Sequence, residues 1–222
     1  MINLFLIISL AVSTYGSSLI KEYPSNFNDA LEYKKEIENI LIEKDIMEPE
    51  FYISIIFPEL MRYNSVSDRL EKWGTKLKYG YLNEYDGYSI GHLQIKPAFA
   101  EKIELYLKSD KNLKKKYQNL LNFDRKKEIK IQRIERLCEY QYEVLYLTAF
   151  IDICCSKYNI DLDDKKNAVK YISAIYNCGF FDELTDYEYA LNQEQFTINK
   201  LSNKKWNYSK LCLYFYELFS NN

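Results

Sequence analysis

Apolar residues recur at three- and four-residue spacing along most of this chain, which predicts helices. The first candidate covers residues 27 to 47, where leucines and isoleucines stand among acids and lysines. It follows Ser25 and Asn26, two residue types that cap helices. The second covers Glu50 to Tyr63, which is short and mostly apolar, as expected of a helix buried in a core.

A proline interrupts the second of these segments. Because its ring removes a backbone donor and crowds the preceding turn, Pro58 should disturb the last turn of the helix. Glu59 would then lie near an irregular helix end.

Further helical patterns cover most of the remaining chain. The stretch between Tyr79 and Gln94 is different. Its glycines and the Asp86-Gly87 pair are typical of a small β-hairpin or an irregular lobe. The predicted fold class is therefore mainly α, with one minor β element. The other expected helices are Asp68–Lys78, Pro97 to about Leu107, Asp124–Tyr158 as one helix or two joined ones, Asp163 or Asp164 to Gly179, and about Tyr208–Phe219.

The composition is that of a folded globule. At 222 residues and 47% hydrophobic content, the chain is long enough for one domain with a sizeable core. The formal net charge is −2, so no overall field favours nucleic acid or an acidic membrane surface as a partner. Eleven basic and four acidic residues lie between Lys108 and Arg136, a charge run that is typical of a solvated helix surface.

The N-terminus has the pattern of an export signal. Leu4 to Val12 is an apolar core of signal-peptide length, short for a membrane span, and small residues such as Thr14 and Gly16 follow it. We therefore expect residues 1–16 to be a signal peptide and residues 17–222 to form a single domain. No membrane span would remain after cleavage. A buried N-terminal strand or helix is the alternative interpretation.

Metal chemistry is not indicated by the sequence. His92 is the only histidine, and the five cysteines have no Cys-x-x-Cys spacing, so we do not expect a zinc site. Most of the cysteines are interpreted as small buried hydrophobic residues. Their pairing and the oligomeric state stay open at this point.

Three short motifs carry the functional interpretation. The first is Glu59, which closes an apolar run. The second is the turn Ile90-Gly91-His92-Leu93-Gln94-Ile95-Lys96-Pro97, and the third is Ala174-Ile175-Tyr176-Asn177-Cys178-Gly179. In this order they resemble the lysozyme-like catalytic domain of the soluble lytic transglycosylases and, more distantly, the goose-type lysozymes.

The chain also departs from that family pattern. Leu60 stands where a serine usually follows the acid, and Tyr88 stands where the family has a glycine. His92-Leu93 replaces Leu-Met, and both gaps between the motifs are longer than usual.

The resemblance implies a lysozyme-like helical domain that cuts peptidoglycan glycan strands between N-acetylmuramic acid and N-acetylglucosamine. Glu59 would act as the single acid and base, and the product would carry a 1,6-anhydro-muramic end, without a metal or organic cofactor. Gly91, Gln94, Tyr176 and Asn177 would bind the substrate. Such an enzyme would work in the periplasm or after secretion.

Apart from the resemblance, the residues around Glu59 favour the chemistry of a proton donor in glycosidic bond cleavage. A departing sugar oxygen needs a proton donor, and burial against Ile55, Ile56 and Phe57 should raise the pKa of Glu59 enough to keep it partly protonated. Hydrolysis would need a second carboxylate, for which Glu84 and Asp86 are the candidates.

Alternative interpretations stay open. One is a hydrolytic muramidase on the same fold, and another is a catalytically inactive domain that binds glycan or an envelope partner. Core packing explains Tyr176 as well as substrate binding does, and a structural role at a turn explains Asn177 better than a chemical one.

Overall fold

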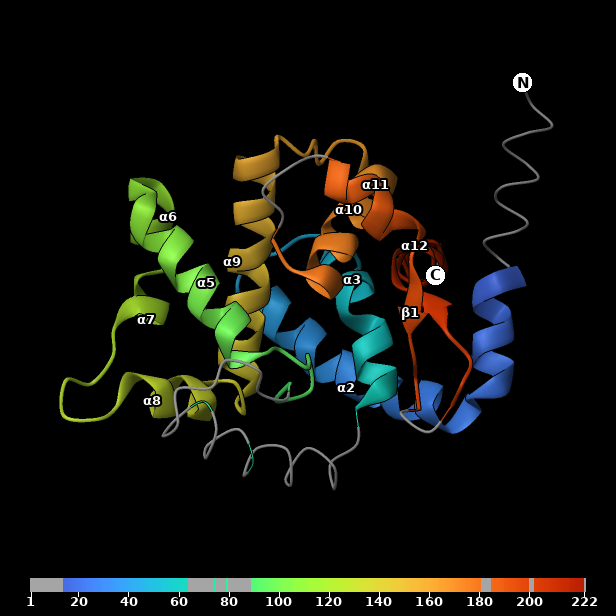
Figure 1. Cartoon of the computed structure of the whole chain (residues 1–222), viewed down its shortest axis with the longest axis horizontal. Helices are drawn as coiled ribbons and strands as arrows, with labels where there is room; N and C mark the ends of the chain where they lie inside the picture. Colours follow the sequence, from blue (N-terminus) through green and yellow to red (C-terminus); the bar gives the residue numbers. More distant parts are fainter. Residues whose placement is uncertain are drawn as a thin grey trace. The chain divides into compact units, whose positions relative to one another are not determined.

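The computed structural model describes residues 14–63, 74, 79, 89–180, 185–199 and 202–221. Over these residues the chain is mainly helical, with a small antiparallel sheet of two strands (Figure 1). The predicted fold class, mainly α with a minor β element, is confirmed at this level. Within the described ranges, no helix is both long and apolar enough to cross a membrane.

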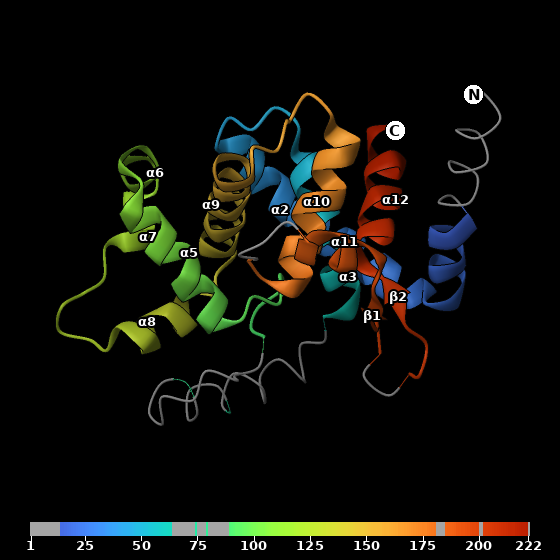
Figure 2. The same ribbon diagram turned by 45° about the horizontal axis from the view of Figure 1, so that its top comes forward.

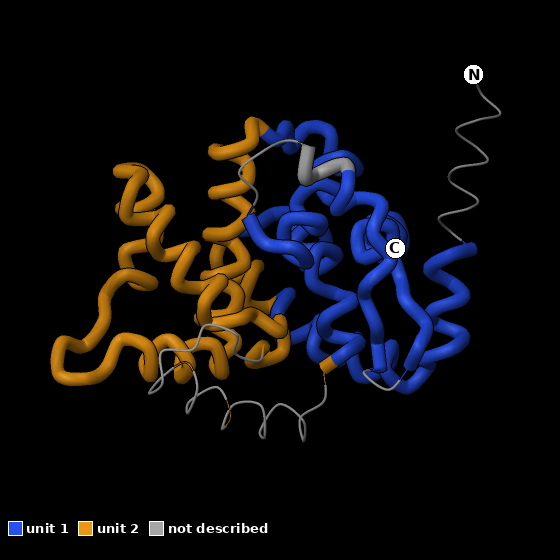
Figure 3. The backbone as a smooth tube through the Cα atoms, in the orientation of Figure 1, with its two compact units in different colours: residues 1–38, 45–62, 160–222 blue, residues 39–44, 63–159 orange. Residues whose placement is uncertain are grey.

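The chain divides into two compact units (Figure 3). Unit 1 consists of residues 1–38, 45–62 and 160–222, and unit 2 consists of residues 39–44 and 63–159. One boundary falls inside helix α2 (Pro24–Glu43). The single domain expected over residues 17–222 stays a prediction.

The core of unit 1 is a group of packed helices. Its central helix, α12, packs against α3 and α10, and α10 also contacts α3 and α11; Figure 2 shows α10 and α12 side by side. The bounds are α3 Pro49–Arg62, α10 Lys165–Cys178, α11 Thr185–Asn192 and α12 Tyr208–Ser220.

Aromatic rings fill the contact between α3 and α12. The ring centroid of Phe57 lies 4.5 Å from that of Phe215 and 4.9 Å from that of Phe219. On its other side, Phe57 meets the ring of Phe27 from α2 at 5.8 Å, edge to face. Because aromatic side chains bury large areas and favour tilted or edge-to-face contacts, this cluster fixes α3 against α12.

Helix α3 continues through Pro58 to Arg62, so the expected irregular end at Glu59 is wrong. Proline cannot donate to the carbonyl one turn earlier. One residue further along, the Ile55 carbonyl accepts hydrogen bonds from the Tyr208 hydroxyl at 3.0 Å and the Cys212 thiol at 3.4 Å. Hydrogen bonds from α12 thus hold the turn that precedes the proline, which is a tertiary contribution that helical periodicity does not reveal.

The start and end of α10 follow the signals in the sequence. The Asp164 carboxylate accepts a hydrogen bond from the backbone N–H of Asn167 at 3.2 Å, as an N-cap does. Gly179 ends the helix at φ +96°, a conformation that favours glycine. These predicted boundaries are confirmed.

Unit 2 is organised around α5 (Pro97–Ser109) and α9 (Tyr140–Tyr158), which lie side by side in Figures 1 and 2. The start of α5 at Pro97 is confirmed, and the segment Asp124–Tyr158 contains two helices, not one. The shorter helices around this pair are α6 Lys111–Lys116, α7 Gln118–Leu121 and α8 Ile129–Arg136.

A buried ionic network joins α5, α8 and α9. The Arg133 guanidinium donates to both carboxylate oxygens of Glu104, at 2.7 and 2.6 Å, and the Tyr146 hydroxyl donates to the same carboxylate at 2.7 Å. Arg133 also donates to the Tyr79 hydroxyl. All of these residues except Tyr79 belong to the three helices, so the network ties them together.

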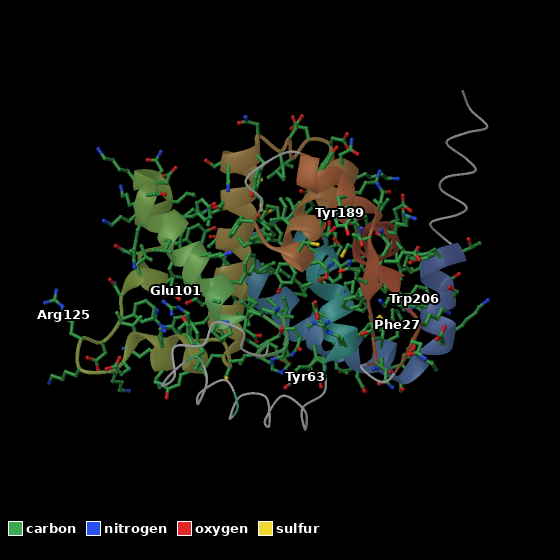
Figure 4. The ribbon with its side chains drawn as sticks, viewed as in Figure 1. Phe27, Tyr63, Glu101, Arg125, Tyr189 and Trp206 are labelled. Atoms are coloured by element: carbon green, nitrogen blue, oxygen red, sulfur yellow. The ribbon has the colours of Figure 1, made fainter. Side chains whose placement is uncertain are left out.

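The basic run from Lys108 to Arg136 is therefore not uniformly a solvated surface. Arg133 and Arg136 are buried, and Arg136 donates to the Leu120 and Asn122 carbonyls. Other members are exposed, such as Arg125 on the loop before α8 (Figure 4).

The two strands of the sheet were not expected from the sequence. β1 (Glu194–Phe196) pairs antiparallel with β2 (Trp206–Asn207) in unit 1. The hairpin or lobe expected between Tyr79 and Gln94 lies largely outside the described residues, as do most of the expected helix at 68–78 and residues 1–13 of the expected signal.

Residues 14–22 form a helix that contacts the C-terminal part of unit 1. The Tyr15 ring meets the Trp206 ring edge-on at 5.2 Å, and the Tyr15 hydroxyl accepts from the backbone N–H of Asn207 at 2.7 Å. Leu19 is fully buried. The end of the expected signal segment thus contributes contacts to the fold.

Candidate functional site

Glu59 lies in the last turn of α3 and is almost completely buried, with 6% of its side chain exposed. Its carboxylate forms an ion pair with the guanidinium of Arg62, three residues later, at 2.5 Å. Burial and this ion pair act in opposite directions, because a low-dielectric setting disfavours a carboxylate whereas a neighbouring cation favours it.

Side chains from α10, α12 and β1 are linked to the Glu59–Arg62 pair through ring contacts or through the charge of Glu59. We call this group, together with the pair, the Glu59 cluster; its other members are Phe196, Tyr176, Tyr208 and Cys212. The Arg62 guanidinium lies 5.0 Å from the Phe196 ring centroid, and the Phe196 ring meets that of Tyr208 at 5.0 Å. The cluster is thus aromatic, with phenol and thiol groups near the acid.

The charge on Glu59 contributes to the pKa values of two polar groups on α12, the Tyr208 phenol and the Cys212 thiol. Burial raises the pKa of Tyr208 well above its ordinary value, and the negative charge of Glu59 adds to the effect. Burial also raises the pKa of the Cys212 thiol, again with a contribution from Glu59, while a hydrogen bond with Ser173 opposes it. Tyr208 and Cys212 are therefore neutral neighbours of the acid at pH 7.

The third motif contributes one residue to this cluster. Tyr176 is half-buried, and its ring stacks with that of Tyr208 at 6.4 Å. Asn177 is exposed, and its side-chain amide lies 3.6 Å from the Cys178 sulfur. The structure thus links Tyr176 to the cluster through Tyr208, whereas Asn177 is exposed beside Cys178.

The glycine motif forms a tight turn in unit 2. The backbone groups of Ile90 and Ile95 exchange two hydrogen bonds of 3.1 Å across it. Gly91 and Gln94 have φ of +74° and +53°, and the Gln94 side-chain amide donates back to the Gly91 carbonyl at 2.8 Å. Gly91 and Gln94 are therefore in direct contact, and glycine suits the first position because it adopts positive φ without steric cost.

A second buried carboxylate, that of Glu143 on α9, holds this turn. Glu143 is fully buried and accepts from the Leu93 N–H at 2.9 Å, while its other oxygen lies 3.2 Å from His92 Nδ1. The His92 ring is sandwiched between Tyr63 and Tyr140, at 4.4 and 4.0 Å. His92 is therefore held by the Glu143 carboxylate and by two tyrosine rings.

Sequence reasoning missed Glu143. It sits within an apolar helical stretch, next to Val144 and close to Leu147. The signal in the sequence was an acid on the apolar side of a predicted helix. Because a buried carboxylate needs hydrogen-bond donors, such an acid indicates a structural contact.

Asp86 and Glu84, the candidates for a second carboxylate, lie outside the described residues. Among the residues that are described, no group of three or more His, Cys, Asp or Glu side chains could hold a metal ion. A shallow groove of about 650 Å³ lies along α2 and the end of α12, and none of the predicted site residues lines it.

The arrangement in unit 1 is a shielded carboxyl group that is paired with a guanidinium. A carboxyl group shielded from water, with phenols and a thiol beside it, is the setting in which an acid can hold or release a proton near neutral pH.

Comparisons with known proteins add no relative: no family model matches the chain, and neither a curated protein nor a solved structure matches it.

Proposed function

We propose that this chain is a lysozyme-like, exported peptidoglycan lytic transglycosylase in which Glu59 is the single acid and base. One observation carries the proposal: the carboxyl group at position 59 is almost completely buried, and its charge acts on Tyr208, whose ring stacks with that of Tyr176 from the third motif. An acid that serves as a proton donor near neutral pH requires this kind of shielding.

The reaction proceeds in two proton transfers. Protonated Glu59 donates to the glycosidic oxygen between N-acetylmuramic acid and N-acetylglucosamine, and the C1–O bond breaks. The resulting carboxylate accepts the proton of the muramic C6 hydroxyl as that oxygen bonds to C1. The products are a free 4-hydroxyl on one side and a 1,6-anhydro end on the other, and Glu59 is protonated again.

No water or second carboxylate takes part in this sequence. Because the C6 hydroxyl is tethered to the reacting sugar, its effective concentration is high, and one acid suffices. A muramidase would instead need a second carboxylate to activate water or attack C1, and Asp86 is the candidate for that role.

The remaining motif residues are assigned to substrate binding. The Gln94 amide both donates and accepts hydrogen bonds, which suits the acetamido and hydroxyl groups of amino sugars. Gly91 is buried, and Glu143 and the Leu137 carbonyl fill the space of its missing side chain, so its contribution is to shape the turn that carries Gln94. Tyr176 offers a ring and a hydroxyl, and Asn177 is the weakest of the four because its side chain is exposed beside Cys178.

The ion pair between Glu59 and Arg62 favours a second candidate function. A permanently paired carboxylate is a poor proton donor, so an inactive domain that binds glycan or an envelope partner would retain the same cluster. Cleavage of glycan separates this candidate from an enzyme.

The test is digestion of purified cell-wall sacculi followed by mass analysis of the soluble products. We expect 1,6-anhydro-muropeptides from the unaltered protein and none from Glu59→Gln, whose circular dichroism should match that of the parent. Glu50→Gln, on the same helix at its first turn, is the matched control and should keep full activity. Reducing ends would indicate the muramidase. No release by the unaltered protein, or full activity of Glu59→Gln, would overturn the proposal.

A further inference from the structure

We infer that Arg62 is a receptor for a carboxylate of the substrate: it pairs with Glu59 in the free protein and transfers to a carboxylate on the muramoyl residue when glycan binds. This inference rests on the proposed function, and it deepens it by assigning substrate selectivity to a residue outside the three motifs. It also explains how an acid with an arginine partner can act as a proton donor.

The first step is the geometry of the pair. Arg62 and Glu59 lie on the same side of α3, three residues apart, with 2.5 Å between nitrogen and oxygen. The side chain of Arg62 is 23% exposed and that of Glu59 is 6% exposed, so the guanidinium is the more accessible partner. A negatively charged ligand can thus meet the arginine before it meets the glutamate.

The second step is the hydrogen bonding of Arg62. Its Nε is buried and has no hydrogen-bond partner among the described residues, and the guanidinium lies over the Phe196 ring. A guanidinium has five donors arranged to bind a carboxylate through two of them at once. When Arg62 turns from Glu59 to a carboxylate ligand, one ion pair replaces another, and a ligand oxygen that pairs with Nε satisfies a donor that is costly to leave unsatisfied.

The third step is the charge balance around Glu59. The titratable neighbours in the cluster are Arg62 on its own helix, Tyr176 on α10, and Tyr208 and Cys212 on α12. At pH 7 a phenol and a thiol are neutral, so Arg62 supplies the positive charge in this group. Once Arg62 has moved to the substrate, Glu59 loses this neighbouring cation, and the loss favours the protonated form of its buried carboxyl group.

Peptidoglycan carries the required carboxylates. Each muramic acid has a lactyl group that ends either in a free carboxylate or in a peptide stem with its own carboxylates. Chitin-like strands, built from N-acetylglucosamine alone, carry none. The proposed transfer therefore makes the enzyme selective for muramoyl-containing strands through charge as well as shape.

The experiment compares two glycan substrates and three variants. The substrates are stem-free glycan strands with free lactyl carboxylates and the same strands with those carboxylates capped as methylamides. The variants are Arg62→Met, which removes the charge, Arg62→Lys, which keeps the charge but not the planar fork, and Lys35→Met as a control on an exposed lysine of unit 1.

We expect the unaltered protein and Lys35→Met to cleave the carboxylate strands about tenfold to a hundredfold faster than the capped strands, the size of a lost charged hydrogen bond. Arg62→Met should cleave both strands at similar rates, and Arg62→Lys should lie in between. In carbon-13 spectra of labelled glutamate, the resonance that disappears in Glu59→Gln should titrate at higher pH in Arg62→Met. An unchanged preference in Arg62→Met, or an unchanged titration of Glu59, would overturn the inference.

Failure of the proposed function would look different. If the unaltered protein cleaves nothing, binding of the two strand types to Glu59→Gln and to the Glu59→Gln, Arg62→Met double variant still tests the receptor role of Arg62. Preference for the carboxylate strands that vanishes with Arg62→Met supports it, and equal binding of both strand types in both proteins contradicts it.

Discussion

The carboxylate of Glu143 occupies the space that a side chain at Gly91 would need. A Cβ built at residue 91 overlaps with Glu143 Oε1 and with the Leu137 carbonyl oxygen. Glu143 in turn accepts a hydrogen bond from the backbone N–H of Leu93. The shape of the turn therefore depends both on the Glu143 carboxylate and on the lack of a side chain at Gly91.

Gly91→Ala should therefore destabilise the protein strongly. The variant incurs the cost of positive φ and also displaces a fully buried carboxylate, so we expect a loss of about 3 kcal/mol or more in the free energy of unfolding. Urea denaturation measures this loss. Gly179→Ala is the matched control, since φ is +96° there but, apart from its chain neighbours, no atom of the described residues lies within 4 Å of the added Cβ. Equal losses in the two variants would show that the overlap with Glu143 is relieved without cost.

The Arg133–Glu104 pair should behave as a buried ion pair. Arg133→Met leaves the Glu104 carboxylate without its cation, and we expect a loss of about 3–5 kcal/mol in the free energy of unfolding. Adding Glu104→Leu should recover part of that loss, because no unpaired buried charge remains. Lys116→Met removes a more exposed pair with Asp152 and should cost less than about 1 kcal/mol. Additive losses in the double variant would argue against coupling.

Stability should fall at high pH because of buried tyrosines. Burial, followed by the charge of Glu104, raises the pKa of Tyr146 well above its ordinary value. In the unfolded chain a tyrosine titrates near pH 10, so between that pH and the higher folded pKa the unfolded state releases a proton that the folded state keeps. The stabilising contribution is complete below about pH 10 and is lost above it.

Tyr146→Phe checks this pH effect. At pH 11 a single such tyrosine accounts for about 1.4 kcal/mol of the loss in unfolding free energy. Urea unfolding at pH 8 and pH 11 should therefore show a smaller decrease in Tyr146→Phe than in the parent, although the variant starts lower because it lacks a hydrogen bond to Glu104. The same decrease in both proteins would contradict the assignment.

Tyr15 should contribute to stability although the sequence places it within the export signal. Tyr15→Ala removes the acceptor for the buried N–H of Asn207 and the edge contact with Trp206, so we expect a loss of about 1–3 kcal/mol. Tyr15→Phe, which keeps the ring, should lose less. The thermal unfolding midpoint reports both changes, and a midpoint unaffected by Tyr15→Ala would indicate that this helix is not part of the stable fold.

Helices with strong end signals were predictable. α5 starts at Pro97, α10 runs from the Asp164 cap to Gly179, and α12 starts at Tyr208, because propensity, caps and periodicity are local properties. The end of α3 was mispredicted: the helix continues through Pro58 to Arg62, and its Ile55 carbonyl accepts from Tyr208 and Cys212, about 150 residues away. β1 and β2 were missed because strands of three and two residues carry almost no alternation.

The amino-acid order by itself determined that the chain is helical, and it singled out Glu59 as an acid in apolar surroundings, because both follow from neighbours in sequence. Only the tertiary structure decided that α12 completes the cluster around that acid, and that Arg62, not an apolar contact, faces its carboxylate. It also decided that Glu143 anchors the glycine turn. Side-chain partners depend on rotamers and on packing between distant segments, and a linear pattern contains neither.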